Sequence, residues 1–127
     1  PFRTFHNTDE PLGFLIEDRR TGERLLWAVD TANLGVTADK LTYIAVECNY
    51  EERLLNRSDR IPSVLKDRIR HSHFEVSDVI RWLHKQDLSG VLTIWLLHLS
   101  AGNSRAEAWQ VRFEREFPGI EIRVCPE

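Results

Sequence analysis

Three polar residues of the sequence each follow an apolar segment, and their types suit metal-ion chemistry. His6 ends the first segment, Asp30 follows the apolar run 25–29, and His98 follows the apolar run 91–97. Ligands bind at strand ends in α/β sheets, and two imidazoles with a carboxylate form a common donor set for zinc, manganese or ferrous iron. Caps and turn residues follow strands in the same way. The spacing alone therefore leaves a metal site and three local hydrogen-bonding roles open.

Glu47 and His73 are two further candidates. Glu47 ends an apolar run, where it either orients a ligand histidine or forms an ion pair or helix cap. Ser72 and Glu75 have the spacing of a capping box, which predicts that His73 lies in the first turn of a helix. The free N–H groups of such a turn favour an anion. His73 would then either donate to a phosphate or make a local hydrogen bond.

The remaining residues predict the elements that position these candidates. Apolar runs indicate strands, and apolar residues at spacings of three and four indicate helices. Gly22 marks the turn of a hairpin, and a second capping box, Ser104 with Glu107, opens the last helix. The predicted order is an α/β arrangement, a mixed sheet with helices on at least one side. Strands are predicted at 12–17, 24–29, 41–47, 91–98 and 120–124, and helices at 50–57, 62–70, 73–83 and 105–117.

Three of the predicted strands are apolar nearly throughout. The runs 12–17, 24–29 and 91–97 are typical of strands that are covered on both faces. The helices of this chain can cover only one side of the sheet. We therefore expect the isolated chain to expose an apolar patch of more than a few hundred Å², which is typical of an interface.

Composition narrows the class of protein. The 127 residues fit one domain, 1–127, and the net charge of −3 lacks the bulk footprint of a nucleic-acid-binding protein, although a local basic patch stays open. No apolar run reaches the roughly 18 residues of a membrane span, so we expect no membrane. The two cysteines are too few for a disulfide framework, which favours a reducing, cytoplasmic compartment. The chain has no methionine, so we expect either a lost initiator or a piece of a longer chain.

Five short segments, taken in order, resemble the metallo-β-lactamase superfamily. They resemble in particular its single-domain, nuclease-like branch from bacteria and phages, which is related to ribonuclease J and tRNA-processing enzymes. The resemblance runs from His6 to Val124 and is to the C-terminal half of that fold. The segments are His6-Asn7 with Glu10-Pro11-Leu12-Gly13-Phe14, then Ala28-Val29-Asp30-Thr31, Val46-Glu47-Cys48-Asn49-Tyr50, Arg70-His71-Ser72-His73, and Leu97-His98-Leu99-Ser100-Ala101-Gly102-Asn103-Ser104.

The resemblance implies half of an αββα sandwich that holds two divalent metal ions, zinc first and manganese as the alternative. It implies that His6 binds one ion, that Asp30 bridges both, and that His98 binds the second. The nucleophile would be a metal-bound hydroxide, whose formation the ions favour near neutral pH. Asp30 and His73 would be catalytic, and His73 would face the substrate phosphate. Residues implied to support the ligands or the substrate are Glu47, Asn7 and Asn103.

The sequence departs from the family pattern in two places. Asn7 stands where the family has aspartate. The HxHxDH motif, which supplies four ligands from the N-terminal half of the sandwich, is absent. The remaining three ligands are too few for two ions, since zinc alone prefers four. The resemblance therefore implies an N-terminal half, in the same chain or in a separate one.

These features predict a metal-dependent hydrolase, most of all a phosphodiesterase or nuclease that acts once the N-terminal half completes it. Its substrate would be nucleic acid or another phosphodiester. One alternative is a non-catalytic half-fold for binding or assembly, in which two halves pair as a homo-oligomer. The other is a hydrolase of a small ester or lactam on the same scaffold.

Overall fold

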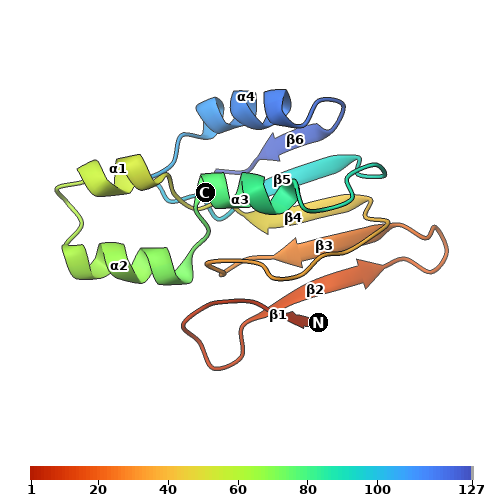
Figure 1. Ribbon diagram of the computed structural model, residues 1–127, viewed down its shortest axis with the longest axis horizontal. Helices are drawn as coiled ribbons and strands as arrows, with labels where there is room; N and C mark the ends of the chain where they lie inside the picture. Colours follow the sequence, from red (N-terminus) through yellow and green to blue (C-terminus); the bar gives the residue numbers. More distant parts are fainter. Residues whose placement is uncertain (127) are drawn as a thin grey trace.

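The computed structural model describes residues 1–126, which form four helices and one mixed sheet of six strands (Figure 1). The strands lie in chain order across the sheet, and the first three are antiparallel while β3 to β6 are parallel. This confirms the predicted α/β class and the hairpin. The strands are β1 (Phe2–Arg3), β2 (Leu12–Glu17), β3 (Arg24–Ala28), β4 (Tyr43–Glu47), β5 (Thr93–Leu97) and β6 (Glu121–Val124).

The helices lie in two of the three crossovers between the parallel strands β3 to β6. α1 (Glu52–Arg57), α2 (Ser63–Ser72) and α3 (Val76–Leu83) connect β4 to β5, and α4 (Ala106–Glu116) connects β5 to β6. At most of the strand and helix ends, the predicted boundary differs from the observed one by one or two residues. None of the described helices has the length and apolar character that crossing a membrane requires.

The parallel strands end together at one edge of the sheet. Ala28 pairs with Val46 and Glu47 pairs with Leu97, so β3, β4 and β5 finish in register. In Figure 1 these strands point toward the side where α1 and α2 lie. We call this edge, where the chain leaves β3, β4 and β5, the carboxyl rim.

One face of the sheet carries the hydrophobic core. The predicted apolar face of α3 is confirmed, since its side chains at Val76, Val79, Ile80 and Leu83 are all buried. In α4, Trp109, Phe113 and the following Phe117 are buried in the same cluster. Alternation along the strands places one row of buried side chains against these helices: Leu26, Ala28, Ile44, Val46, Ile94, Leu96 and Ile122.

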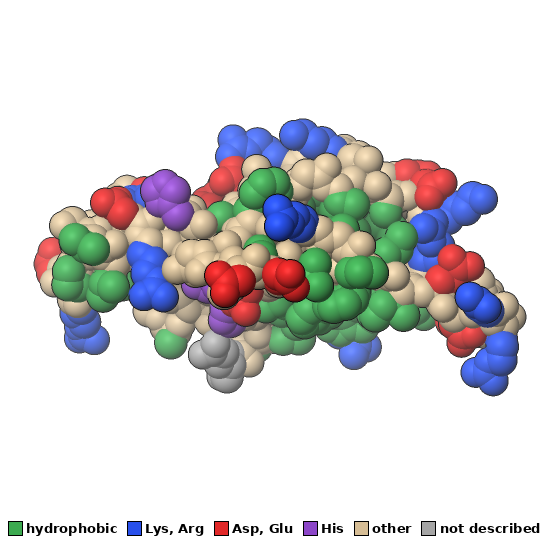
Figure 2. Space-filling model, turned by 90° about the horizontal axis from the view of Figure 1, so that it is seen from below, with side chains coloured by type: hydrophobic (Ala, Val, Ile, Leu, Met, Phe, Trp, Pro, Cys, Tyr) green, Lys and Arg blue, Asp and Glu red, His purple; other side chains and the backbone are tan. Residues whose placement is uncertain are grey.

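The opposite face of the sheet is not covered by a helix within residues 1–126. Register places one set of side chains on this open face: Phe14, Ile16, Leu25, Trp27, Tyr43, Ala45, Trp95 and Leu97. Phe14 and Ile16 are 39% and 52% exposed, and Trp27 and Trp95 are half-buried. The prediction that 12–17 is covered on both faces is wrong within this chain, because β2 lies near the edge of the sheet beyond the helices. Figure 2, seen from the side of β1 and β2, shows hydrophobic side chains gathered along this edge.

Both predicted capping boxes are wrong. α2 continues through Ser72, and His73 is its C-cap, with its N–H donating to the Ile69 carbonyl at 2.9 Å. His73 therefore follows one helix and does not open the next. The carboxylate of Glu75 itself caps α3 by accepting from the Ser77 and Asp78 N–H groups. At α4 the hydroxyl of Ser104 donates to the carbonyl of Ser100 at 2.7 Å, so it is not a helix cap.

Candidate metal centre

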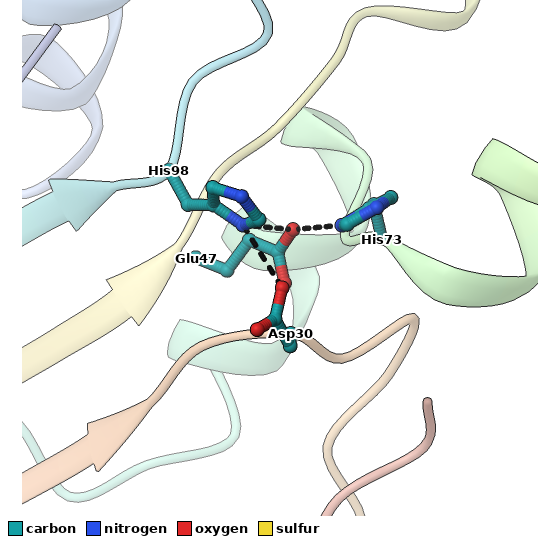
Figure 3. Close-up of side chains that lie close together, drawn as sticks. All are labelled: Asp30, Glu47, His73 and His98. Carbon is teal, nitrogen blue, oxygen red and sulfur yellow. Dashed lines mark hydrogen bonds and ion pairs between the residues drawn. The ribbon is translucent and has the colours of Figure 1, made fainter. Parts of the chain in front are cut away.

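Four side chains from four separate segments meet at the carboxyl rim. They are Asp30 after β3, Glu47 at the end of β4, His73 between α2 and α3, and His98 after β5 (Figure 3). One donor atom from each lies within 4.8 Å of all the others. We call these residues the four-residue cluster. Of the ligands predicted from sequence, the fold brings Asp30 and His98 together, 3.3 Å apart.

The backbone turns sharply at two members of the cluster. Asp30 and His98 have φ angles of 55° and 57°, in the left-handed region that residues other than glycine rarely adopt. Such a conformation costs on the order of 1–3 kcal/mol and concentrates at functional sites. The amide of Asn49 donates to the His98 carbonyl at 2.7 Å and so supports the turn after β5. A residue with a positive φ angle thus follows both β3 and β5, on either side of Glu47.

Glu47 is the centre of the cluster. Its side chain is fully buried, and its Oε1 lies 2.6 Å from Nδ1 of His73 and 3.2 Å from Nδ1 of His98. Its Oε2 accepts a hydrogen bond from the N–H of Thr31 at 2.7 Å. One carboxylate therefore ties together the chain after β3, the end of α2 and the chain after β5. Glu47 does lie beside two histidines, as the first of its predicted roles requires.

The cluster has a buried floor and an open mouth. The side chain of Glu47 is 0% exposed and that of His73 is 22% exposed, whereas the side chains of His98 and Asp30 are 32% and 55% exposed. The hydrogen bond that the His73 ring donates to Glu47 raises the pKa of His73, and burial of the ring opposes this rise. The charges of Glu47 and Asp30 raise the pKa of His73 further, so the cluster favours a cation.

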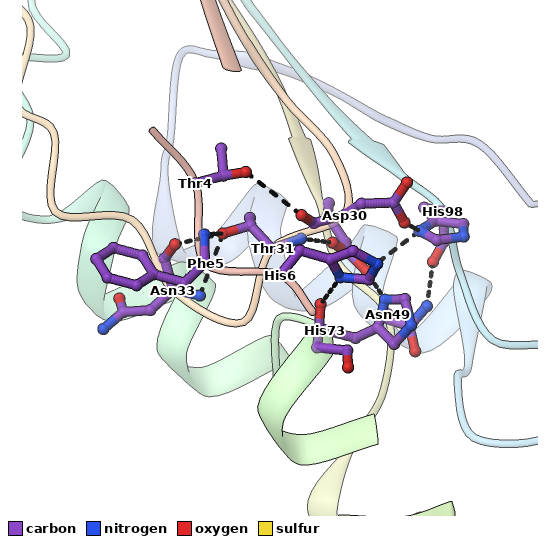
Figure 4. Close-up of polar contacts among 11 residues, drawn as sticks. Thr4, Phe5, His6, Asp30, Thr31, Asn33, Asn49, His73 and His98 are labelled. Atoms are coloured by element: carbon purple, nitrogen blue, oxygen red, sulfur yellow. Dashed lines mark hydrogen bonds and ion pairs between the residues drawn. The ribbon is translucent and has the colours of Figure 1, made fainter. Parts of the chain in front are cut away.

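His6 lies beside the four-residue cluster and not within it (Figure 4). Its ring centroid is 5.4 Å from that of His73, which is 5.2 Å from that of His98. The Nδ1 of His6 is 2.8 Å from the Ser72 carbonyl, which accepts its proton and leaves Nε2 free. The segment that carries His6 is held against the chain after β3, because the Phe5 N–H donates to the Thr31 hydroxyl at 2.9 Å. The three predicted histidines therefore form a row along the rim.

The two predicted asparagines lie outside the cluster. Asn7 is exposed in the loop after β1. Asn103 is 3% exposed, its carbonyl accepts from the Glu51 N–H at 2.8 Å, and its amide donates to the Ser100 hydroxyl at 3.0 Å. Asn103 thus fixes the loop that follows His98 and touches none of the four donors.

Two residues at the site escaped the sequence analysis. Thr31 supplies both the N–H that binds Glu47 and the hydroxyl that holds Phe5. Asn49 supports the backbone of His98. Each is one or two residues from a candidate, in Asp30-Thr31 and in Glu47-Cys48-Asn49, and this adjacency is the only signal that the sequence offers.

The donor set of the cluster suits a divalent metal ion. Imidazole nitrogens and carboxylate oxygens are the ligands that zinc shares with manganese and iron. A carboxylate that accepts from Nδ1 of a histidine is also a common support for a ligand, because it leaves Nε2 for the ion. Glu47 has this relation to both His73 and His98. It can serve either as a direct ligand or as the group that orients both rings.

Comparisons with models of known protein families, with curated proteins and with solved structures find no match to this chain. The resemblance to the metallo-β-lactamase superfamily thus has the residues of the chain as its only support. What is established is an α/β fold whose carboxyl rim gathers a group of side chains that could hold a metal ion.

Proposed function

We propose that the four-residue cluster binds a divalent metal ion and that the chain is half of a metal-dependent hydrolase acting on phosphodiesters. The observation that carries the proposal is the convergence of two carboxylates and two imidazoles within 4.8 Å, from segments far apart in sequence. The phosphodiester substrate is supported by the resemblance alone, through the segments around His73 and His98.

The cluster has enough donors for one ion, with zinc the first expectation and manganese the second. A second ion would need His6, which lies next to His73, and further ligands from another layer. A divalent ion supplies Lewis acidity toward a phosphoryl oxygen. The chain's own residues do the positioning, since Glu47 holds the rings of His73 and His98 through their Nδ1 atoms.

The open face supports the second half of the proposal. Glu47 pairs with Leu97 in the row of side chains that points to the open face, so the cluster lies at the rim on that side of the sheet. A layer that covers Trp27 and Trp95 would therefore reach the cluster. We propose that this layer is the N-terminal half of the fold, in the same chain or in a separate one, and that it completes the ligand set.

Hydrolysis of bis(p-nitrophenyl) phosphate by the chain loaded with Zn²⁺ or Mn²⁺ tests the proposed activity. We expect hydrolysis far slower than a completed site would give, because this chain supplies the donors of one ion and not the full ligand set, and we expect Asp30→Ala to abolish it. His84→Ala is the matched control, because His84 also pairs with a glutamate at 2.6 Å but lies between α3 and α4. Faster hydrolysis of p-nitrophenyl acetate or a lactam than of the diester would instead favour the small-substrate hydrolase. Diester hydrolysis that is equal in Asp30→Ala and wild type would contradict the proposal.

A non-catalytic assembly module is the second candidate, and the open face favours it. Aromatic side chains lie in pairs on that face, Phe14 with Trp27 at 6.1 Å and Tyr43 with Trp95 at 5.7 Å between ring centroids. Aromatic residues are enriched at the centres of interfaces. Sedimentation of the metal-free chain distinguishes this candidate, which requires a stable homo-oligomer whether or not Zn²⁺ binds.

A further inference from the structure

A separate cavity is bordered by the loop that follows His98 at the carboxyl rim. It has a volume of about 600 Å³ and is lined by the connection between α1 and α2, from Arg57 to Ile61, and by the loop Ser100–Asn103. That loop begins two residues after His98, and α1 and α2 stand at the rim in Figure 1. One wall of the cavity is thus the loop that follows the candidate ligand His98, and the lining includes none of the four members of the cluster.

The charges of this cavity favour an anion. Two arginines line it, Arg57 and Arg60, against the single acidic residue Asp59. Neither arginine forms an ion pair within residues 1–126, whereas Arg53, Arg70 and Arg105 around them are each paired with a glutamate. Unpaired guanidinium groups recognise phosphate oxygens through paired N–H donors.

The rest of the lining suits the sugar or base that accompanies a phosphate. Asn103 lies in the wall, is 3% exposed, and has an Oδ1 with no hydrogen-bond partner within residues 1–126. Leu54 and Ile61 supply an apolar wall.

We propose that this cavity binds a phosphate group of a nucleotide or a nucleic-acid strand, with Arg57 and Arg60 as its ligands. The inference names the substrate class of the proposed function, but the binding that it predicts does not need the metal ion. It also supplies the local basic patch that a chain of net charge −3 would need in order to hold nucleic acid.

The experiment measures binding of a labelled single-stranded oligonucleotide, and of AMP as competitor, to the full chain in EDTA. We expect Arg57→Ala/Arg60→Ala to weaken oligonucleotide binding by about tenfold or more, since charged hydrogen bonds are lost. The matched control is Arg19→Ala/Arg20→Ala, which removes the same charge from the exposed turn between β2 and β3. Arg57→Lys/Arg60→Lys keeps the charge and should recover only part of the affinity.

The outcomes separate the sources of the phosphate and the two proposals. Competition by AMP with the same arginine dependence indicates a phosphate monoester, and binding of the oligonucleotide alone indicates a phosphate within a strand. Equal losses in both double variants, or none in either, would overturn the inference. Because Arg57 also ends α1, melting temperatures within about 2 °C of wild type are required of each variant. Because the binding is measured in EDTA, failure of the metal site leaves this result unaffected and is read separately.

Discussion

At the residue scale, one buried carboxylate organises the site. Glu47 accepts from Thr31 and pairs with both His73 and His98, so three chain segments depend on one side chain. Its charge is balanced by a histidine whose pKa it raises. Removing one partner from a buried hydrogen-bonded group costs much more than removing an exposed one.

Glu47→Gln tests this dependence. The amide keeps the volume but offers one oxygen where the carboxylate offered two, so it cannot accept from both sides of the site. We expect a loss of about 2–4 kcal/mol in the free energy of unfolding, measured with urea in EDTA. Glu116→Gln, at the exposed pair with His84, should cost less than about 1 kcal/mol. Similar losses in the free energy of unfolding for Glu47→Gln and Glu116→Gln would show that Glu47 does not hold the three chain segments together.

The raised pKa of His73 predicts a pH dependence of the metal-free protein. Because its folded pKa lies above the ordinary value of 6.5, its contribution to stability is fully present below that value and is lost as pH rises through the raised pKa. We therefore expect the stability difference between wild type and His73→Gln to shrink between about pH 5 and about pH 8. Urea unfolding in EDTA measures it. A difference that grows with pH would mean that Glu47 does not stabilise the protonated ring.

At the element scale, the strands could be predicted from sequence and the caps could not. Apolar runs identified β2 to β6 because each strand has to bury at least one face. The spacing of Ser72 and Glu75 is compatible with a capping box and also with a helix that ends at Ser72 and a new helix capped by Glu75. The local sequence does not decide between these two structures. Here the chain before Glu75 remains helical through Ser72, and the parallel bridge between Tyr50 and Glu75 leaves Glu75 extended as the N-cap of α3.

Because Glu75 caps α3 and Ser72 does not, substitutions of these two residues should differ in their effect on stability. Glu75→Ala removes the side chain that accepts from Ser77 and Asp78, and should cost about 1 kcal/mol. Ser72→Ala should be close to neutral, because the buried Ser72 hydroxyl has no hydrogen-bond partner within residues 1–126. Thermal unfolding of both variants measures the effects. A larger cost for Ser72→Ala would restore the capping box predicted from sequence.

The site was only partly predictable for a related reason. Asp30 and His98 could be identified because each follows an apolar strand, and strands β3 and β5 both border β4. The placement of His73 depends on where α2 ends, and that of His6 on hydrogen bonds from the segment 4–6 to the chain after β3 and to the Ser72 carbonyl. These are contacts between residues distant in sequence, which no local spacing encodes.

At the scale of the whole molecule, residues 1–126 cover one face of the sheet and leave the other open. The helices and the buried row from Leu26 to Ile122 form one layer of core, while the open face keeps aromatic and aliphatic side chains half-buried or exposed. The apolar side chains on the open face belong to the same strands whose sequences are apolar nearly throughout. A second layer at that face would also close over the cluster at the rim.

Charge on the open face tests whether it is an interface. Trp95→Lys should reduce binding of a hydrophobic dye and any self-association, while the buried face of the sheet preserves the fold. Val64→Lys, at a 76% exposed residue of α2, is the matched control and should change neither. Dye fluorescence and sedimentation velocity measure both effects. A wild-type chain that is monomeric and binds no dye would contradict the expectation of a covering layer.

The most direct test of the metal centre is a calorimetric titration of the metal-free chain with Zn²⁺. We expect one ion to bind to wild type with release of protons, because the hydrogen bond to Glu47 raises the pKa of His73 and a ligating imidazole has to be neutral. Asp30→Ala and His98→Ala should weaken binding by more than the roughly 10–100-fold that loss of a supporting residue costs, and His84→Ala should leave it unchanged. Zinc binding of equal strength in all four proteins, or no binding to wild type, would contradict a metal centre at the carboxyl rim.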